Sequence, residues 1–188
     1  MLKSKLKNII AGKSFNSLLK EKQLFEIFGV SISSNLFSLL LPALLMMNLL
    51  FVSLPAFVGA YAAYMCIIVF HEMGHAMLAK KVGLPVTGIY IKWYGGYCRF
   101  ARPPNTHRDA ALIAFGGPGV QFLLAIPALL LVFLFQLNPL TMIGSFVLIL
   151  TKWNIIMALL NLIPIGPLDG KVIWNYLKNK TLYDKLDK

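Results

Sequence analysis

The stretch His71-Glu72-Met73-Gly74-His75 lies near the end of a long apolar run, just before the basic pair Lys80-Lys81. Two histidines four residues apart project from one face of a helix, so one metal ion can contact both imidazoles. The glutamate between them can reach a metal-bound water without being a ligand, as in zinc hydrolases. The alternative is a buried polar patch between helices, although three ionisable groups in one turn of a membrane-length segment are costly unless paired.

The whole chain is too apolar for an ordinary soluble domain. Its 188 residues are 58% hydrophobic and 13% charged, which predicts one all-α polytopic membrane protein in a lipid bilayer. The formal net charge is +11, but the basic residues flank apolar runs and form no stripe with interleaved aromatics. A cytoplasmic membrane surface is therefore the expected partner, and nucleic acid is not. Cys66 and Cys98 form no CxxC pair, so neither a disulfide framework nor a cysteine zinc site is indicated.

The apolar region from Leu36 to Phe70 is too long for one membrane crossing, which takes about 20 residues. Ser53-Leu54-Pro55 is the expected break, because proline removes a donor and biases the preceding residue away from helix. About four transmembrane helices are predicted, at residues 35–52, 56–79, 110–135 and 140–163. The membrane domain at residues 31–170 follows a basic amphipathic segment at 1–30, expected to be an interfacial helix, and precedes a basic tail at 171–188.

The loop between the second and third spans is rich in β-branched and aromatic residues. They fall in residues 86–94 and 97–100, separated by Gly95-Gly96, which predicts a short membrane-associated β-hairpin. This hairpin either has a functional role or is only a structural element at the membrane surface.

Basic residues also predict the orientation of the chain. The amino-terminal segment, the loop after the second span and the tail are basic, while both remaining turns are uncharged. An even number of spans with both termini in the cytoplasm satisfies the positive-inside rule. A helix rises roughly 13 Å from His71 to Lys80, so the site is expected below the cytoplasmic membrane surface.

A catalytic zinc site has three protein ligands and an open position for water, so one ligand remains to be found. Asp169 is the best candidate, because it follows the last span in a segment rich in proline and glycine that cannot continue as a regular helix. Alternatively, Asp169 is the N-cap of a helix that begins near Lys171. His107, in a basic loop, is a weaker candidate. Lys152, near the middle of the fourth span, either pairs with a carboxylate, lines a water path or snorkels to the surface.

Two motifs carry a family resemblance. His71-Glu72-Met73-Gly74-His75, followed by the stretch from Asn161 to Gly170, resembles the paired motifs of the site-2 protease family of intramembrane zinc metalloproteases. That family's second motif is usually written N-P-x-P-x-x-x-L-D-G, and Leu162 replaces its first proline. Since no stretch is long enough for an inserted PDZ domain or a carboxyl-terminal CBS domain, a compact form is expected.

Weaker resemblance lies at Gly95-Gly96-Tyr97 and at Gly117-Pro118-Gly119-Val120-Gln121, where Gln121 replaces the asparagine of the family's G-P-x-x-N. The resemblance implies one Zn²⁺ ion as cofactor and a set of site residues. The implied metal ligands are His71, His75 and Asp169, the catalytic residues are Glu72 as general base and Asn161, and the substrate-binding residues are Gly95, Gly96 and Tyr97. Asn161 would hold the substrate backbone or the oxyanion, or else it only caps the fourth span.

The resemblance implies an endopeptidase that cleaves within or near the transmembrane segment of a single-span membrane protein, as in regulated intramembrane proteolysis. The expected location is the plasma membrane, with a regulatory membrane partner. A prenyl-protein type of membrane metalloprotease also has an HExxH helix, but the Leu-Asp-Gly segment and the small size of the chain favour the site-2 type. The remaining alternative is a non-catalytic protein that binds metal or sequesters a membrane substrate.

Overall fold

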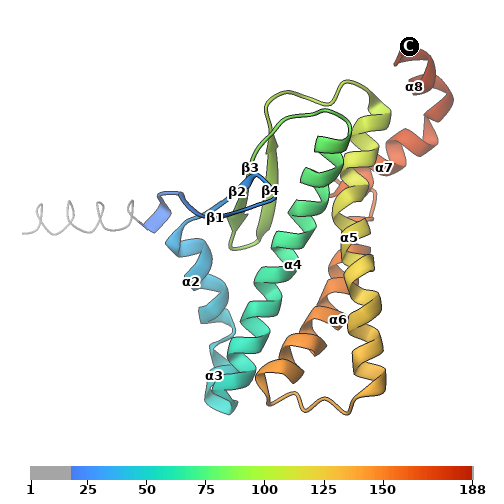
Figure 1. The fold of residues 1–188 in the computed structure, drawn as a ribbon. Coiled ribbons are helices and arrows are strands. Elements are labelled where there is room, and N and C mark those ends of the chain that lie inside the picture. Colours follow the sequence, from blue (N-terminus) through green and yellow to red (C-terminus); the bar gives the residue numbers. More distant parts are fainter. Residues whose placement is uncertain (1–17, 188) are drawn as a thin grey trace, which may run out of the picture.

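The computed structural model describes residues 18–187, which are mostly helical with one small sheet (Figure 1). The helices are α2 (Leu36–Leu45), α3 (Met47–Val52), α4 (Leu54–Lys81), α5 (His107–Leu134), α6 (Met142–Asn161), α7 (Asp169–Lys178) and α8 (Lys180–Leu186). The strands are β1 (Lys22–Ile27), β2 (Val30–Ser34), β3 (Val86–Lys92) and β4 (Gly95–Phe100).

Within residues 18–187, three helices, α4, α5 and α6, are long and apolar enough to cross a membrane, and they pack against one another (Figure 1). They correspond to the second, third and fourth predicted spans, and they make the chain an integral membrane protein. Gly74 and Gly116 lie where α4 and α5 meet, and a side chain on either would overlap the backbone of the other. The two helices therefore touch backbone to backbone beside the histidines.

The first predicted span, residues 35–52, is not one helix. It is divided at Met46 into α2, which contains Pro42, and the short α3, and neither is long enough to cross a membrane alone. The break expected at Ser53-Leu54-Pro55 is confirmed, because the Ser53 side chain accepts a hydrogen bond from the Ala56 backbone N–H and caps α4. Proline fits here because it lies in the first turn of α4, where its missing N–H is not needed.

The sheet is larger than the predicted hairpin, with strand order β1-β2-β3-β4. β2 pairs with β3 in parallel and the other two pairs are antiparallel. The prediction of an interfacial helix in the segment at residues 1–30 is wrong from Lys22 onward, while residues 1–17 of that segment lie outside the described part. Phe28 and Gly29 both have positive φ and form the two-residue turn of a β1–β2 hairpin, and parallel pairing with β3 stabilises β2.

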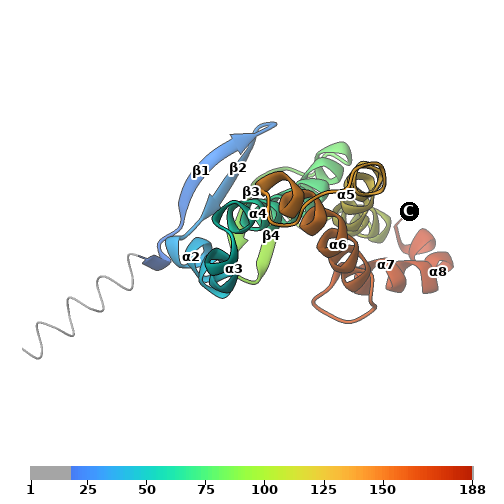
Figure 2. The ribbon, with the colours of Figure 1, turned by 90° about the horizontal axis from the view of Figure 1, so that it is seen from below.

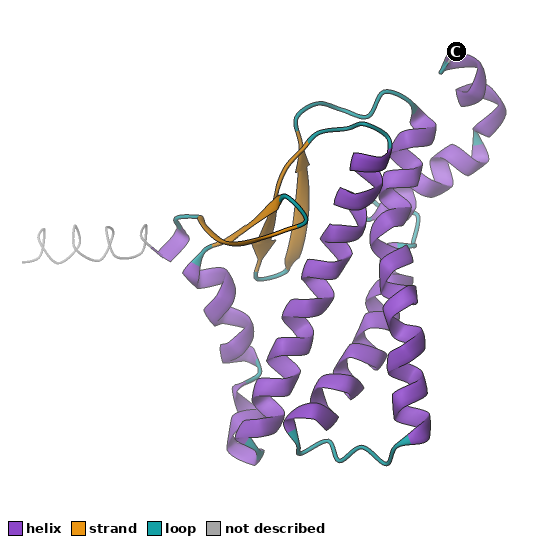
Figure 3. Cartoon of the chain, in the orientation of Figure 1, coloured by secondary structure: helices purple, strands orange, loops and turns teal. Residues whose placement is uncertain are grey.

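The β3–β4 turn was also misplaced, because Trp93 and Tyr94 form it while Gly95 and Gly96 belong to β4. The sheet packs on α4 through a buried apolar cluster that includes Ile32, Ile89 and Ile68. Figures 2 and 3 show the strands on one side of α4, opposite α5 and α6. The helix that carries the histidine motif is therefore held between the sheet and two long helices.

Candidate metal centre

His71 and His75 of α4 and Asp169, the first residue of α7, point their ligand atoms at one another. The two Nε2 atoms are 3.1 Å apart. One carboxylate oxygen of Asp169 lies 3.2 Å from Nε2 of His71, and the other lies 3.5 Å from Nε2 of His75. The structure thus brings together three potential ligands from two helices that are distant in sequence.

Hydrogen bonds on the far sides of the rings decide where the imidazole protons lie. Nδ1 of His75 is 2.8 Å from the carbonyl oxygen of Ile113, which only accepts, so Nδ1 carries the proton. Nδ1 of His71 is 3.0 Å from Oε1 of Gln121, which accepts in the same way. With Nδ1 protonated, each neutral ring presents the lone pair of Nε2 toward Asp169, whose buried Oδ2 then has, within the described part of the chain, only the 3.2 Å contact with Nε2 of His71. A cation at the centre would satisfy this cluster of lone pairs and negative charge.

The spacing of these atoms fits a zinc ion. A tetrahedral ion with bonds of 2.0–2.1 Å holds its ligand atoms roughly 3.3 Å apart. The separation of 3.1 Å between the two Nε2 atoms, and those of 3.2 and 3.5 Å from them to the two carboxylate oxygens of Asp169, are of this size. Two imidazoles and one carboxylate are also a donor set that zinc accepts in catalytic sites.

Gly117 of α5 makes room for the two imidazoles. A Cβ at this position would lie 2.5 Å from Cε1 of His71 and 2.6 Å from Nε2 of His75. No L side chain fits there without displacing a ring. Gly116, one residue earlier, lets the backbone of α5 approach that of α4.

The carboxylate of Asp169 is positioned by contacts that hold α7 against the end of α6. Trp174 Nε1 donates to the carbonyl oxygen of Leu162 at 2.9 Å, and a side chain at Gly170 would overlap that same carbonyl group. Leu168 is the N-cap of α7, so Asp169 does not take the N-cap position and its carboxylate faces the histidines.

Glu72 lies beside this group and is only 5% exposed. A Cβ at Gly96 of β4 would lie 2.7 Å from Cγ and 3.0 Å from Oε1 of Glu72. The edge strand β4 therefore passes directly over the glutamate. Tyr97, the next residue of β4, is 41% exposed and stacks on Tyr90.

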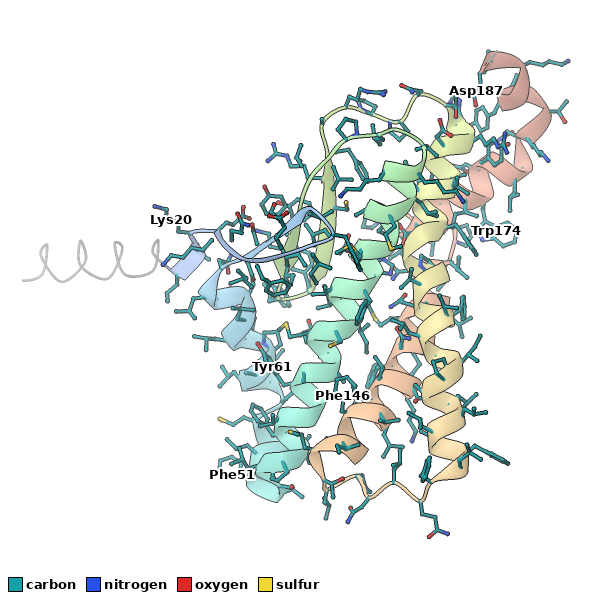
Figure 4. All side chains as sticks on the ribbon, in the orientation of Figure 1. Lys20, Phe51, Tyr61, Phe146, Trp174 and Asp187 are labelled. Atoms are coloured by element: carbon teal, nitrogen blue, oxygen red, sulfur yellow. The ribbon has the colours of Figure 1, made fainter. Side chains whose placement is uncertain are left out.

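The other residues considered from sequence lie apart from this group or at its border. Asn161 is the last residue of α6 and is half-buried, with the loop to Asp169 beginning just after it. His107 starts α5, where its Nδ1 lies 2.9 Å from Oδ1 of Asp187 and its ring stacks on Tyr183. Figure 4 shows Asp187 near that end of α5. His107 thus links α8 to α5 and does not join the candidate metal ligands.

Sequence reasoning left the role of Gln121 open and missed the carbonyl group of Ile113. Gln121 is 1% exposed, and its backbone carbonyl oxygen accepts a hydrogen bond from Nδ2 of Asn154 on α6. Two signals in the sequence pointed to it, a glutamine inside an apolar span and its position in the stretch that resembles the family's G-P-x-x-N. No sequence pattern reveals a backbone carbonyl that meets a histidine of another helix.

Gln121→Leu is expected to lower zinc affinity by about 10–100-fold, the usual cost of losing a residue that orients a ligand histidine. Leucine cannot accept a hydrogen bond from Nδ1–H of His71, so the tautomer and the orientation of the ring are no longer fixed. Gln121→Glu keeps an acceptor and should retain most of the affinity. Competition with a chromophoric chelator in detergent measures both variants, and equal affinities for Gln121→Leu and the unmodified protein would contradict this role.

Comparisons with known proteins agree with this geometry. The family model described as peptidase family M50 matches residues 59–144. A Synechocystis protein, provisionally named a zinc metalloprotease, is 31% identical over 119 residues, which are 60% of this chain and 31% of that protein. A zinc metalloprotease of Methanocaldococcus jannaschii is 28% identical over 164 residues, or 84% of this chain and 45% of that protein. The chain therefore spans less than half the length of each relative.

A solved structure shows the same fold. The site-2 protease from Methanocaldococcus jannaschii superposes with a TM-score of 0.65 at 24% sequence identity, covering 86% of this chain and 73% of that chain. The segment that the family model matches contains the histidine motif and Gln121. The structure of this chain places Asp169, which lies outside that segment, beside the two histidines. The motif and the converging ligands therefore agree with the comparisons, which make the chain similar to peptidase family M50 and, in its fold, to a site-2 protease.

Proposed function

We propose that the chain is a zinc-dependent intramembrane endopeptidase that cleaves a peptide bond within or near the transmembrane segment of a membrane protein. The observation that carries this proposal is the convergence of the facing Nε2 atoms of His71 and His75 with the carboxylate of Asp169, next to a buried glutamate. When bound, a zinc ion supplies Lewis acidity that acidifies water and polarises a carbonyl group.

The protein's own residues divide the remaining work. Gln121 and the carbonyl group of Ile113 hold the two imidazoles with Nε2 directed at the centre. Glu72 accepts the proton of the attacking water and returns it to the amine that leaves. Asn161, at the end of α6, donates a hydrogen bond to the substrate backbone or to the oxyanion.

The proposal includes four membrane crossings, the first made by α2 and α3 together, with both termini on the cytoplasmic side of the plasma membrane. The turns between α3 and α4 and between α5 and α6 carry no charge and lie at the same end of the molecule (Figure 1). The sheet, α7 and α8 lie toward the opposite end, where the basic residues concentrate. We expect the substrate to be a single-span membrane protein and cleavage to be controlled by a regulatory membrane partner.

A metal-exchange experiment tests the enzymatic part of the proposal. The protein is reconstituted in vesicles with a panel of labelled single-span proteins, and cleavage is followed before and after treatment with a zinc chelator. We expect the chelator to abolish cleavage and added zinc to restore it, whereas magnesium should not, because it prefers oxygen ligands in octahedral geometry. Cleavage by the metal-free protein would refute the proposal. Stoichiometric zinc binding without cleavage of any panel member would favour the non-catalytic alternative.

The free edge of β4 is the proposed docking strand for the substrate, with Gly95, Gly96 and Tyr97 in contact with it. A transmembrane helix hides its carbonyl groups in its own hydrogen bonds, so it must unwind before cleavage. An extended segment paired with β4 would pass over Glu72, because β4 itself does so.

Tyr97→Pro is therefore expected to abolish cleavage while the zinc content stays normal. Proline removes a backbone N–H and fixes φ, which disrupts β4 without touching a metal ligand. Phe25→Pro makes the same change in β1, the opposite edge of the sheet, and should retain cleavage. Cleavage assays paired with zinc analysis check both variants, and normal turnover by Tyr97→Pro would remove β4 from the proposal.

A further inference from the structure

Lys152 lies near the middle of α6 and faces outward. Its side chain is exposed, as are those of Trp153 and Ile156, while Thr151 and Asn154 face the interior of the molecule. The exposed residues recur every three to four positions, so they form one stripe on the outer side of α6. We call this stripe, with Leu159 and Leu160 at its end, the α6 outer face.

A lysine at this depth cannot remain in contact with lipid at low cost. The middle of a membrane-crossing helix lies about 15 Å from either edge of the hydrocarbon core, which is farther than a four-carbon side chain extends by snorkelling. An ammonium group left in hydrocarbon is strongly unfavourable. Trp153 adds a second sign, because tryptophan at a lipid-facing position normally lies at the membrane surface and not at its centre.

The described part of the chain offers no partner for this charge. Among residues 18–187, the ion pairs do not involve Lys152. The three long helices contain two acidic residues, Glu72 and Asp109. Glu72 is buried beside the metal ligands, and Asp109 lies in the first turn of α5. A second copy of this chain therefore brings no carboxylate to this depth from those helices, and a lipid headgroup does not reach it.

The α6 outer face leads directly to the candidate metal centre. Beyond Leu160 the exposed surface continues through residues 163–167, the loop that connects α6 to Asp169. A helix that lies along the stripe would reach this loop at its end. Its position is therefore compatible with delivering a peptide bond to the site.

We propose that the α6 outer face binds the transmembrane segment of the substrate, and that this segment carries an aspartate or glutamate near the middle of the membrane, paired with Lys152. This inference rests on the proposed function and adds a chemical requirement to it. The carboxylate of the substrate segment gives the selectivity for this segment. A wholly apolar helix on the α6 outer face would leave the ammonium group of Lys152 unpaired.

A binding experiment separates this inference from catalysis. Labelled peptides of about 20 residues, made of leucine and alanine with one central Asp, Asn or Leu, are added to Glu72→Gln protein in phosphatidylcholine vesicles. Energy transfer between labelled peptide and labelled protein gives the affinity without cleavage. We expect the Asp peptide to bind about tenfold more tightly than the other two, and Lys152→Leu to remove this preference.

Matched variants show whether the position of the charge matters. Lys152→Leu combined with Leu123→Lys moves the ammonium group to an exposed site near the middle of α5, and should not restore the preference. Lys152→Asp should prefer a peptide with a central Lys. Equal binding of the three original peptides, or an Asp preference that persists in Lys152→Leu, would overturn the proposal. Zinc content, measured on each variant, shows that the fold around α7 is intact.

Cleavage by the protein with Glu72 intact then identifies the occupant. Faster cleavage of the Asp peptide than of the Asn peptide, with the difference lost in Lys152→Leu, supports a substrate on the α6 outer face. Asp-selective binding with equal cleavage of both peptides would overturn the assignment of this face to the substrate. If single-span panel proteins are cleaved but the Asp preference is absent, the inference fails and the proposed function stands.

Discussion

Glu72→Gln is expected to reduce cleavage by about 10²–10⁴-fold, the usual contribution of a general base, while the bound zinc remains. Glutamine has nearly the shape of glutamate, so it should still fit between α4 and Gly96 of β4. Its amide oxygen can still accept a hydrogen bond but cannot take up the proton of the attacking water. A loss of cleavage with zinc still bound would therefore result from the missing general base and not from a missing metal ion.

Metal analysis and cleavage of one co-reconstituted substrate measure this separation. Glu26→Gln, the same substitution at an exposed position of β1, serves as the control and should behave like the unmodified protein. Loss of zinc from Glu72→Gln would make Glu72 a ligand and contradict its role as base. Full cleavage with full zinc occupancy would remove the hydrolase mechanism altogether.

Asp169→Asn should lower zinc affinity by more than about 100-fold, exceeding the 10–100-fold expected for a residue that only orients a ligand. The substitution removes the negative charge of the ligand set. The asparagine amide can also donate to Nε2 of His71 or His75, which relieves the facing lone pairs in the metal-free protein. We therefore expect a metal-free Asp169→Asn protein that is at least as stable as the unmodified one.

Thermal unfolding with and without zinc checks both effects. Zinc should raise the unfolding temperature of the unmodified protein and have little effect on Asp169→Asn, because stabilisation by a ligand depends on its affinity. Asp109→Asn, in the first turn of α5, should keep the full response to zinc. An equal zinc response in Asp169→Asn would mean that His71 and His75 hold the metal with another partner.

Local periodicity accounts for what could be predicted correctly. A four-residue interval places His71 and His75 on one helix face in any fold, and apolar runs of membrane length predict α4, α5 and α6. The position of Asp169 after the last span makes it the best candidate for the third ligand, but spacing alone leaves an N-cap role open, and the family resemblance favours the ligand role. Contacts between elements that are distant in sequence carry no such local signal.

The helix that presents the histidine motif, the three long apolar helices and the basic segments around them can thus be predicted from the order of residues alone. Packing between distant elements sets the other features: the parallel pairing of β2 with β3, the place of Gly96 over Glu72, the carbonyl group of Ile113 behind His75 and the outward direction of Lys152. The two groups of features differ in how far along the chain their causes act. Helix geometry and hydrophobicity act along neighbouring residues, whereas strand pairing, backbone contact and the side of a helix that meets lipid depend on how whole elements pack.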